Sequence, residues 1–226
     1  MAEGRRKLII GGDSAFAEVA YEYFTHDSDY EVVAFTVERE YLKRDTLCGL
    51  PIVPFETLEQ VFDPAEHSVY VALVYTQLNR PRTRLSREAK AKGFGLASYV
   101  SSRAFVWRNV EIGEHVFIFE DNVIQPFVRI GNNVVLWSGN HIGHHSKIAD
   151  NCFVSSHVVI SGFVEVGENC FLGVNSTISN NVRIGRDCWL GPNTIVVKDA
   201  PETSLFKPGK SEIAGVSTLR WFKLDE

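Results

Sequence analysis

Three histidines lie within five residues of one another in the segment SGNHIGHHSKI, which spans residues 138–148. They are His141, His144 and His145. An imidazole can ligate a metal ion, and because it titrates near neutral pH it can also act as a general base. It can equally be a solvated side chain on a turn. The role of each ring depends on where the backbone directs it, so the elements around the segment are considered next.

Composition and charge describe an ordinary soluble protein. The chain is 45% hydrophobic and carries a formal net charge of −5. Its length of 226 residues is enough for one large or two small domains. Without a basic excess we expect neither a nucleic-acid partner nor an anionic membrane. No stretch approaches the roughly 20 apolar residues that span a bilayer, and the short apolar run near residue 8 is not expected to be a secretory signal. We therefore expect a cytoplasmic protein without membrane insertion.

The four cysteines contain no C-x-x-C pair. They are expected to be reduced thiols, as is usual in the cytoplasm. Three of them are spaced eighteen residues apart, and these are Cys152, Cys170 and Cys188.

Strand-like runs alternate with helical segments in residues 1–100. The β-rich runs are KLIIGG (7–12), EVVAFTVE (31–38), SVYVALVY (68–75) and LASYV (96–100). The helical segments are SAFAEVAYEYFTH (14–26) and NRPRTRLSREAKAKG (79–93). Continuous apolar strands that alternate with helices predict a small, doubly wound α/β domain with a parallel sheet.

A six-residue repeat replaces this alternation from Val100 onward. Every sixth residue is aliphatic, and the residue two positions earlier is compact. The aliphatic positions are Val100, Val106, Ile112, Ile118, Ile124, Ile130, Leu136, Ile142, Ile148, Val154, Ile160, Val166, Leu172, Ile178, Ile184, Leu190 and Val196. Such a period requires a chain that turns every six residues, so that three hexads make one triangular coil. We expect this all-β domain over residues 101–200 and a C-terminal tail over 201–226.

The hexapeptide pattern resembles that of the left-handed β-helix acyltransferases. The α/β domain before it narrows the resemblance to the nucleotide-amino-sugar N-acetyltransferases, such as those of the bacillosamine, perosamine and sialic-acid gene clusters. The likeness covers essentially the whole chain. It implies a left-handed parallel β-helix, a homotrimer, and acetyl-CoA as co-substrate in the groove between adjacent prisms. It also implies acetyl transfer to the amino group of a nucleotide-linked deoxyamino sugar, without a metal.

A zinc site is the first alternative for the histidines. Gamma-class carbonic anhydrases use the same helix and bind zinc with three histidines, one of them in a segment similar to Ile142-Gly143-His144. Their pattern places another histidine where this chain has Ala149, and a third where residues 108–110 stand. Two of the three ligands that an open zinc site needs are therefore missing, and we expect no bound metal.

The resemblance implies a general base at His144, because residues 144–148 match the family's frame of a histidine followed four residues later by an interior aliphatic. The family has an acidic residue directly after the base, whereas this chain has His145. Eighteen residues on stands Gly162, whose backbone N–H would stabilise the thioester oxyanion, and a glycine allows close approach. Other possibilities are that His141 is the base, or that no histidine is.

The binding residues implied by the resemblance are less specific. Asn180 continues the column of His144 and Gly162, while Lys198 and Lys207 flank the last coil, where the family holds the phosphates of coenzyme A. Gly162 would also contact the cofactor. Solvated lysines explain Lys198 and Lys207 equally well.

The acceptor site is expected at the end of the first strand, in the segment IIGGDSAF (9–16). A glycine turn that opens a helix favours a phosphate, and the segment resembles the family's nucleotide-binding turn. The acceptor-binding residues would be Gly11, Gly12, Asp13, Ser14 and His141. The segment is not a full G-x-G-x-x-G motif, so a plain strand–helix turn is the alternative. The acidic pair that often follows the second strand in the family is also absent, and AFTVERE (34–40) stands there.

Two other functions remain open from the sequence. A histidine base serves a hydroxyl as well as an amine, so a sugar O-acyltransferase is one of them. The other is a non-catalytic trimeric solenoid that only displays its N-terminal domains. The presence of both His144 and Gly162 on one column favours catalysis.

Overall fold

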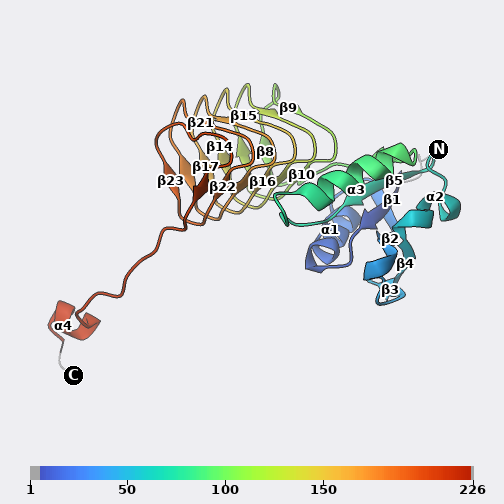
Figure 1. Cartoon of the computed structure of the whole chain (residues 1–226), viewed down its shortest axis with the longest axis horizontal. Helices are drawn as coiled ribbons and strands as arrows, with labels where there is room; N and C mark the ends of the chain where they lie inside the picture. The colour runs from blue at the N-terminus through green and yellow to red at the C-terminus, as the bar shows by residue number, and fades with distance from the viewer. Residues whose placement is uncertain (1–5, 225–226) are drawn as a thin grey trace.

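The computed structural model describes residues 6–224 as an α/β domain, a triangular prism of stacked coils and an extended C-terminal segment (Figure 1). The α/β domain has a six-stranded sheet in the order β3-β4-β2-β1-β5-β6, in which only β3 is antiparallel to its neighbour. Its elements are β1 (Arg6–Gly11), α1 (Ala15–His26), β2 (Tyr30–Val37), η1 (Arg39–Tyr41), β3 (Thr46–Leu47), β4 (Leu50–Pro54), η2 (Phe55–Thr57), α2 (Leu58–Val61), β5 (His67–Val71), α3 (Arg80–Ala91) and β6 (Gly95–Leu96). The doubly wound α/β fold predicted from the sequence is confirmed.

The order of the strands creates a switch point at β1. This strand pairs with β2 on one side and with β5 on the other. The strands that follow β1 first are therefore added on one side of it, and the later strands on the other side. One face of the sheet packs on α1 and the other on α2 and α3. In such folds ligands bind outside the carboxyl ends of the strands at this point.

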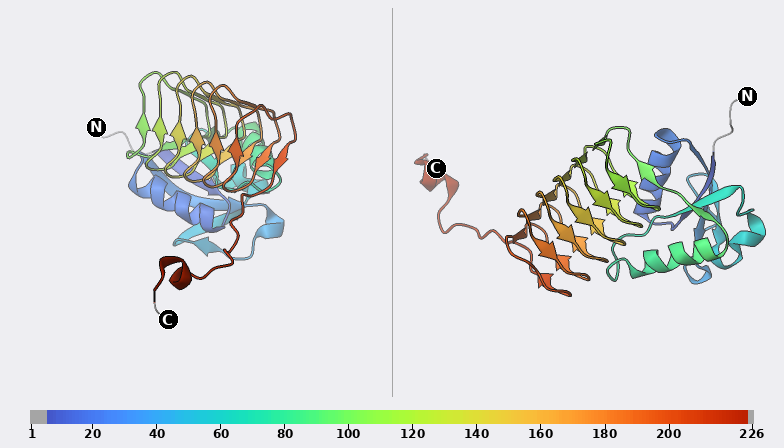
Figure 2. Two further views of the ribbon diagram at one scale, coloured as in Figure 1. Left: turned by 90° about the vertical axis from the view of Figure 1, so that its left-hand side faces the viewer. Right: turned by 90° about the horizontal axis from the view of Figure 1, so that it is seen from above.

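The prism begins at β7 (Tyr99–Val100) and is built from two-residue strands, one on each side of each triangular coil except the last, whose charged side has only an isolated bridge (Figure 2). The strands form three parallel sheets. The aromatic face contains β7, β10 (Phe117–Ile118), β13 (Val135–Leu136), β16 (Phe153–Val154), β19 (Phe171–Leu172), β22 (Trp189–Leu190) and β24 (Leu205–Phe206). The apolar face contains β8 (Phe105–Val106), β11 (Val123–Ile124), β14 (His141–Ile142), β17 (Val159–Ile160), β20 (Thr177–Ile178) and β23 (Ile195–Val196). The charged face contains β9 (Glu111–Ile112), β12 (Arg129–Ile130), β15 (Lys147–Ile148), β18 (Glu165–Val166) and β21 (Arg183–Ile184).

The sixth-residue aliphatics fill the interior of the prism, as the left-handed β-helix requires. From Ile118 to Val196 all of them are buried, and they form one cluster with the compact residues beside them. Cys152, Cys170 and Cys188 belong to this cluster as free thiols. The first coil departs from the predicted interior row, because no coil precedes it: Val106 and Ile112 are only half-buried, and Val100 is 40% exposed.

The outward residue that precedes each interior aliphatic gives each face its character. On the aromatic face these residues include Phe117, Phe153, Phe171 and Trp189. On the charged face they carry both signs, with ion pairs Arg129–Glu111, Lys147–Glu165 and Arg183–Glu165. On the apolar face they are Phe105, Val123, His141, Val159, Thr177 and Ile195, and the large apolar ones among them are exposed.

The α/β domain packs on the aromatic face. Phe16 of α1 lies 5.8 Å from Phe117 between ring centroids, and Tyr75, which follows β5, lies 4.4 Å from Phe171. Polar contacts supplement these: Arg80 pairs with Asp187 of the prism at 2.7 Å. The aromatic side chains of both domains form one buried cluster, which fixes the orientation of the domain on the prism.

His115 is a buried hydrogen-bonding link at this junction. Its Nε2 accepts the N–H of Val71 at 2.9 Å, so its Nδ1 carries the proton and donates to Asn133 Oδ1 at 2.8 Å. Burial, together with the charge of the nearby Arg82, lowers the pKa of His115 from 6.5 to about 3. The ring is therefore neutral in the folded protein near neutral pH.

Acid should consequently destabilise the junction. Below pH 6.5 the unfolded chain binds a proton at His115 that the folded chain does not, so stability falls by about 1.4 kcal/mol per pH unit, toward a limit near pH 3. In His115→Gln the amide oxygen can still accept the Val71 N–H, but it does not titrate. Between pH 6.5 and 5 we expect the wild type to lose about 1.6 kcal/mol more than this variant in denaturant unfolding. Equal losses would contradict a buried neutral His115.

The chain leaves the prism after β24 in an extended segment that ends in α4 (Thr218–Phe222), far from the α/β domain (Figures 1 and 2). Across residues 6–224, no helix combines the length and the hydropathy needed to cross a bilayer.

Candidate active site

His144 and His145 lie on the turn between β14 and β15, at the corner where the apolar face meets the charged face. Both side chains are exposed. The backbone N–H of His144 donates to Gln125 Oε1 at 2.9 Å, which links this turn to the coil before it. The prediction that both rings lie outside one corner of the prism agrees with these positions.

The ring of His144 rests directly on Gly162, one coil later. A Cβ atom added to Gly162 would lie 2.9 Å from Cε1 and 3.0 Å from Nε2 of His144. Real Cβ atoms are essentially never this close to another heavy atom, so any side chain at position 162 would push the ring away. The glycine therefore makes room for the imidazole, in addition to any role of its backbone.

The N–H of Gly162 is not free. It donates to Asn180 Oδ1 at 2.9 Å, one further coil along the same corner. A thioester oxygen that uses this N–H must therefore displace the Asn180 side chain, which is exposed. Sequence reasoning placed Gly162 and Asn180 on one column but gave no sign that they bond to each other.

His145 is flanked by aromatic rings. Its ring stacks on Phe127 at 4.6 Å and on Phe163 at 4.7 Å between centroids. Its Nδ1 lies 3.1 Å from Nδ1 of His144. Phe127 and Phe163 were not singled out from the sequence, although their spacing of eighteen residues from His145 was available as a signal.

The remaining residues of the predicted site are distributed around the apolar face. His141 is half-buried on β14, paired in register with Val123 and Val159. Lys198 follows β23 and continues the corner of His144, whereas Lys207 follows β24 at the other edge of this face. Both lysines are exposed. They flank the last coil, as expected, but they do not meet at one point.

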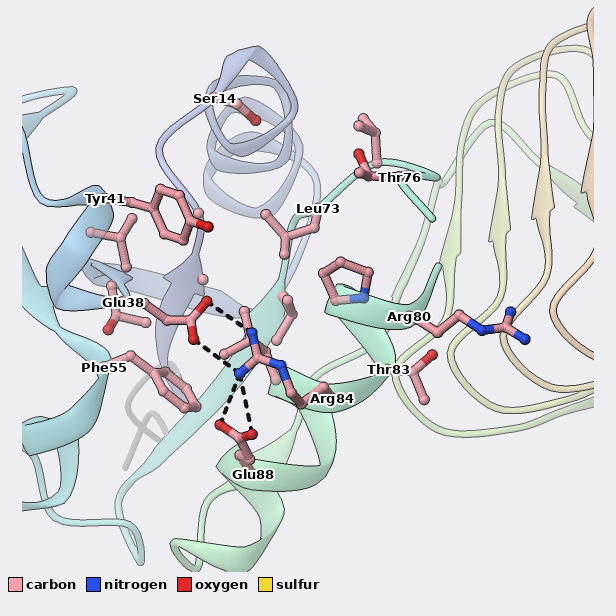
Figure 3. A pocket seen from close by; sticks show the side chains of 18 of the residues that line it. Ser14, Glu38, Tyr41, Phe55, Leu73, Thr76, Arg80, Thr83, Arg84 and Glu88 are labelled. Atoms are coloured by element: carbon pink, nitrogen blue, oxygen red, sulfur yellow. Dashed lines mark hydrogen bonds and ion pairs between the residues drawn. The ribbon is translucent and has the colours of Figure 1, made fainter. Parts of the chain in front are cut away.

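A cavity of about 980 Å³ lies at the switch point of the α/β sheet (Figure 3). It is lined by Gly11, Gly12, Asp13 and Ser14, as well as by residues after β2 and β5 and along α3. The four predicted acceptor residues of the first turn thus share one cavity, and His141 lies elsewhere, on the prism. A volume of this size is typical of small-molecule sites.

Charged groups cross the cavity from opposite walls. Arg84 of α3 pairs with Glu38, which directly follows β2, at 2.9 Å and with Glu88 at 3.2 Å (Figure 3). Hydrogen bonding to Glu38 and Glu88 raises the pKa of Arg84, which therefore stays charged. Glu38 was not predicted as a lining residue, because a single acidic residue stands there in place of the expected acidic pair. Its position directly after the second strand was the signal.

The cavity and His144 lie on different sides of the prism. The α/β domain covers the aromatic face, and the corner of His144 is the edge of the triangle opposite that face. Within residues 6–224, no group of three or more His, Cys, Asp or Glu side chains is arranged to hold a metal ion.

Sequence profiles match the repeat region. The family described as "Bacterial transferase hexapeptide (six repeats)" matches residues 109–144, 127–162 and 145–180. "Hexapeptide repeat of succinyl-transferase" matches residues 163–198. No sequence among curated proteins matches the chain significantly.

Solved structures match nearly the whole chain. PerB from Caulobacter crescentus, in complex with CoA and GDP-perosamine, has 27% sequence identity and a TM-score of 0.78, over 88% of this chain and 92% of that one. The acetyltransferase domain of PglB from Neisseria gonorrhoeae, in complex with acetyl coenzyme A, has 22% identity and a TM-score of 0.64, over 89% and 96%. At that identity PglB supports the fold alone. The repeat and the preceding α/β domain both agree with PerB, so the chain is similar over most of its length to a hexapeptide-repeat N-acetyltransferase of a nucleotide-linked amino sugar.

Proposed function

We propose that the protein transfers an acetyl group from acetyl-CoA to the amino group of a nucleotide-linked deoxyamino sugar. The observation that carries this proposal is the exposed ring of His144, which rests on Gly162 in a fold that also keeps a nucleotide-sized cavity. The relative PerB was solved with CoA and GDP-perosamine. We infer that this chain takes the same two classes of substrate.

His144 would act as the general base. The sugar amine attacks the thioester carbonyl carbon, and Nε2 of His144 accepts the proton that the nitrogen loses as the new bond forms. Collapse of the tetrahedral species breaks the carbon–sulfur bond. The departing thiolate then takes the proton back from His144, so that amide and free thiol are formed and the imidazole is regenerated.

The oxyanion would be stabilised by the N–H of Gly162. Because Asn180 Oδ1 now accepts this bond, the thioester oxygen replaces Oδ1 when acetyl-CoA binds. The exposed Asn180 amide can then turn, so that its NH₂ group donates to the same oxygen. Two donors at the developing charge are typical of oxyanion sites.

The nucleotide of the acceptor would occupy the cavity of the α/β domain. The turn from Gly11 to Ser14 opens the 12-residue helix α1, and the N–H groups of a helix start suit the diphosphate. Glu38 stands where doubly wound folds place the acidic residue that accepts ribose hydroxyl groups. Acetyl-CoA would lie along the apolar face, with Asn180, Lys198 and Lys207 contacting its polar groups and His141 beside the sugar.

A homotrimer would complete the site. Phe105, Val123, Val159 and Ile195 expose a column of apolar side chains along the prism, which is the kind of surface that a second copy covers. Since the cavity and His144 of one chain face different sides, we infer that the nucleotide bound by one subunit presents its sugar to His144 of a neighbour.

This shared site predicts complementation between two inactive variants. His144→Ala removes the base, and Ser14→Trp would fill the mouth of the cavity at an exposed residue that makes no side-chain cap bond. Each variant alone should be inactive. After equal co-expression, random assembly should restore about one quarter of wild-type activity, because a site works when its cavity comes from one variant and its histidine from the other. Activity no higher than that of the separate variants would contradict a site shared between subunits.

The function itself is tested by the release of free thiol from acetyl-CoA in the presence of a panel of nucleotide-linked amino sugars. We expect release with at least one amine-bearing sugar, and none with the same sugar already N-acetylated. Thiol release that is independent of any acceptor, or absent with the whole panel, would contradict the proposal.

A further inference from the structure

The corner that carries His145 has an unusual set of turn residues. Phe127, His145 and Phe163 occupy equivalent positions in three successive coils, and all three have left-handed backbone conformations, with φ of 66°, 61° and 58°. At the other two corners the left-handed residues of the repeat are glycine, asparagine, aspartate or histidine, with one threonine near the end. These residue types, threonine apart, are the ones that tolerate this conformation.

Phenylalanine is a poor choice for such a turn. A left-handed conformation costs a bulky residue roughly 1–2 kcal/mol, and the rings of Phe127 and Phe163 remain 55% and 50% exposed in the chain. Asparagine fills the next equivalent position, Asn181, where φ is 62°. The two phenylalanines are therefore not required by the coil, and strained residues of this kind cluster at functional sites.

What the two phenylalanines do is hold one ring between them. Their ring planes lie at 27° and 16° to that of His145, so His145 is sandwiched and cannot rotate freely. In this orientation its Nδ1 faces Nδ1 of His144 at 3.1 Å. Phe163 also meets the His144 ring edge-on, at 5.1 Å.

The short distance between the two Nδ1 atoms restricts where the protons can lie. A hydrogen bond between them needs a proton on one Nδ1 and a lone pair on the other. If His144 is to accept a proton at Nε2, its own proton must be on Nδ1 and must be donated to Nδ1 of His145. The remaining proton of His145 is then on Nε2, which leaves the pair neutral.

We propose that His145 is the positioning residue of the base, and that Phe127 and Phe163 form an aromatic clamp that fixes its ring. This inference rests on the proposed role of His144. His145 takes the place of a carboxylate: it selects the Nδ1–H form of His144 and shares the positive charge that forms when Nε2 accepts the proton of the amine. In the charged pair the shared proton can move from Nδ1 of His144 to Nδ1 of His145, and it returns when the thiolate is protonated.

The test compares three substitutions that suit the left-handed turn. His145→Gly removes the acceptor and should lower kcat by about 10- to 100-fold, the range found for partners that orient a metal-ligating histidine. His145→Asp and His145→Asn each restore an acceptor beside Nδ1 of His144. They should recover most of the loss, and Asp should recover more, because it also stabilises the charged ring. KM for acetyl-CoA should stay close to the wild-type value in all three. Equal kcat values for Gly and Asp would overturn the proposal.

A spectroscopic measurement separates this inference from the function. In ring-¹⁵N-labelled protein, NMR should report His144 as the Nδ1–H tautomer, and in His145→Gly it should change to the Nε2–H form. This readout needs no substrate, so it holds even if the acetyl transfer itself is not found. A wild-type Nε2–H tautomer at His144, in an active enzyme, would overturn the positioning role and leave the proposed function intact.

The clamp has its own control. Phe127→Asn and Phe163→Asn relieve the strained turns, so neither should lower the thermal midpoint. Both should lower kcat, and in both the NMR spectrum should show a mixture of the two His144 tautomers. If the clamp were only structural, the two variants would lose stability and keep their activity.

Discussion

Replacing His144 by alanine should lower kcat by ~10² to 10⁴, the range typical for loss of a general base. The side chain is exposed at the corner of the prism, and its ring packs only on neighbouring turn residues. The fold should therefore be retained, and the affinity for acetyl-CoA should change little. Steady-state kinetics with a saturating amino-sugar acceptor would measure the effect.

His141 provides the matched control. It projects from the same coil three residues earlier, but on the apolar face rather than at the corner. His141→Ala should reduce activity less than His144→Ala, mainly through KM for the acceptor. An inactive His141 variant beside an active His144 variant would show that the base has been assigned to the wrong ring.

Replacing Gly162 by alanine should cause the second-largest loss, about 10²-fold in kcat, because misplacing a catalytic group by a fraction of an ångström to an ångström costs this much. The added methyl group would meet the end of the His144 ring rather than the backbone. The ring can move at little cost in stability, so the thermal midpoint should hardly change while the base leaves its position.

Gly143 is the control for this prediction. A Cβ there would lie 2.5 Å from the backbone carbon of Ser161 and 2.6 Å from the nitrogen of Gly162, and these atoms cannot move without opening the coil. Gly143→Ala should therefore lower the thermal midpoint clearly, whereas Gly162→Ala should not. Full activity of Gly162→Ala would contradict the claim that Gly162 keeps the His144 ring in its catalytic position.

The repeat made the prism predictable. Interior aliphatics at every sixth residue leave one geometry in which all of them are buried, so the coil, its corners and the stacking of cysteines followed from spacing alone. The same reasoning placed His144, Gly162 and Asn180 in one column. The prediction that Val100 lies in the interior was wrong, because the rule for interior coils does not apply to the first rung.

The contacts within the site were less predictable. Spacing gives the position of a side chain on the prism but not its rotamer, so the bond from Gly162 N–H to Asn180 and the sandwich around His145 were not foreseen. In the α/β domain, no period relates Glu38 to Arg84, because β2 and α3 come together only through the winding of the sheet. Such pairs depend on tertiary structure, which local pattern cannot supply.

Characterising the product tests the central claim most directly. After reaction with acetyl-CoA and the preferred nucleotide-linked amino sugar, mass spectrometry should show one added acetyl group for each thiol released. This group should resist alkaline hydroxylamine, which cleaves an oxygen ester but not an amide. The same reaction with His144→Ala should give almost no product. An acetyl group that hydroxylamine removes would be an ester and would identify an O-acyltransferase. A full yield of amide product from His144→Ala would contradict the mechanism derived from this corner of the prism.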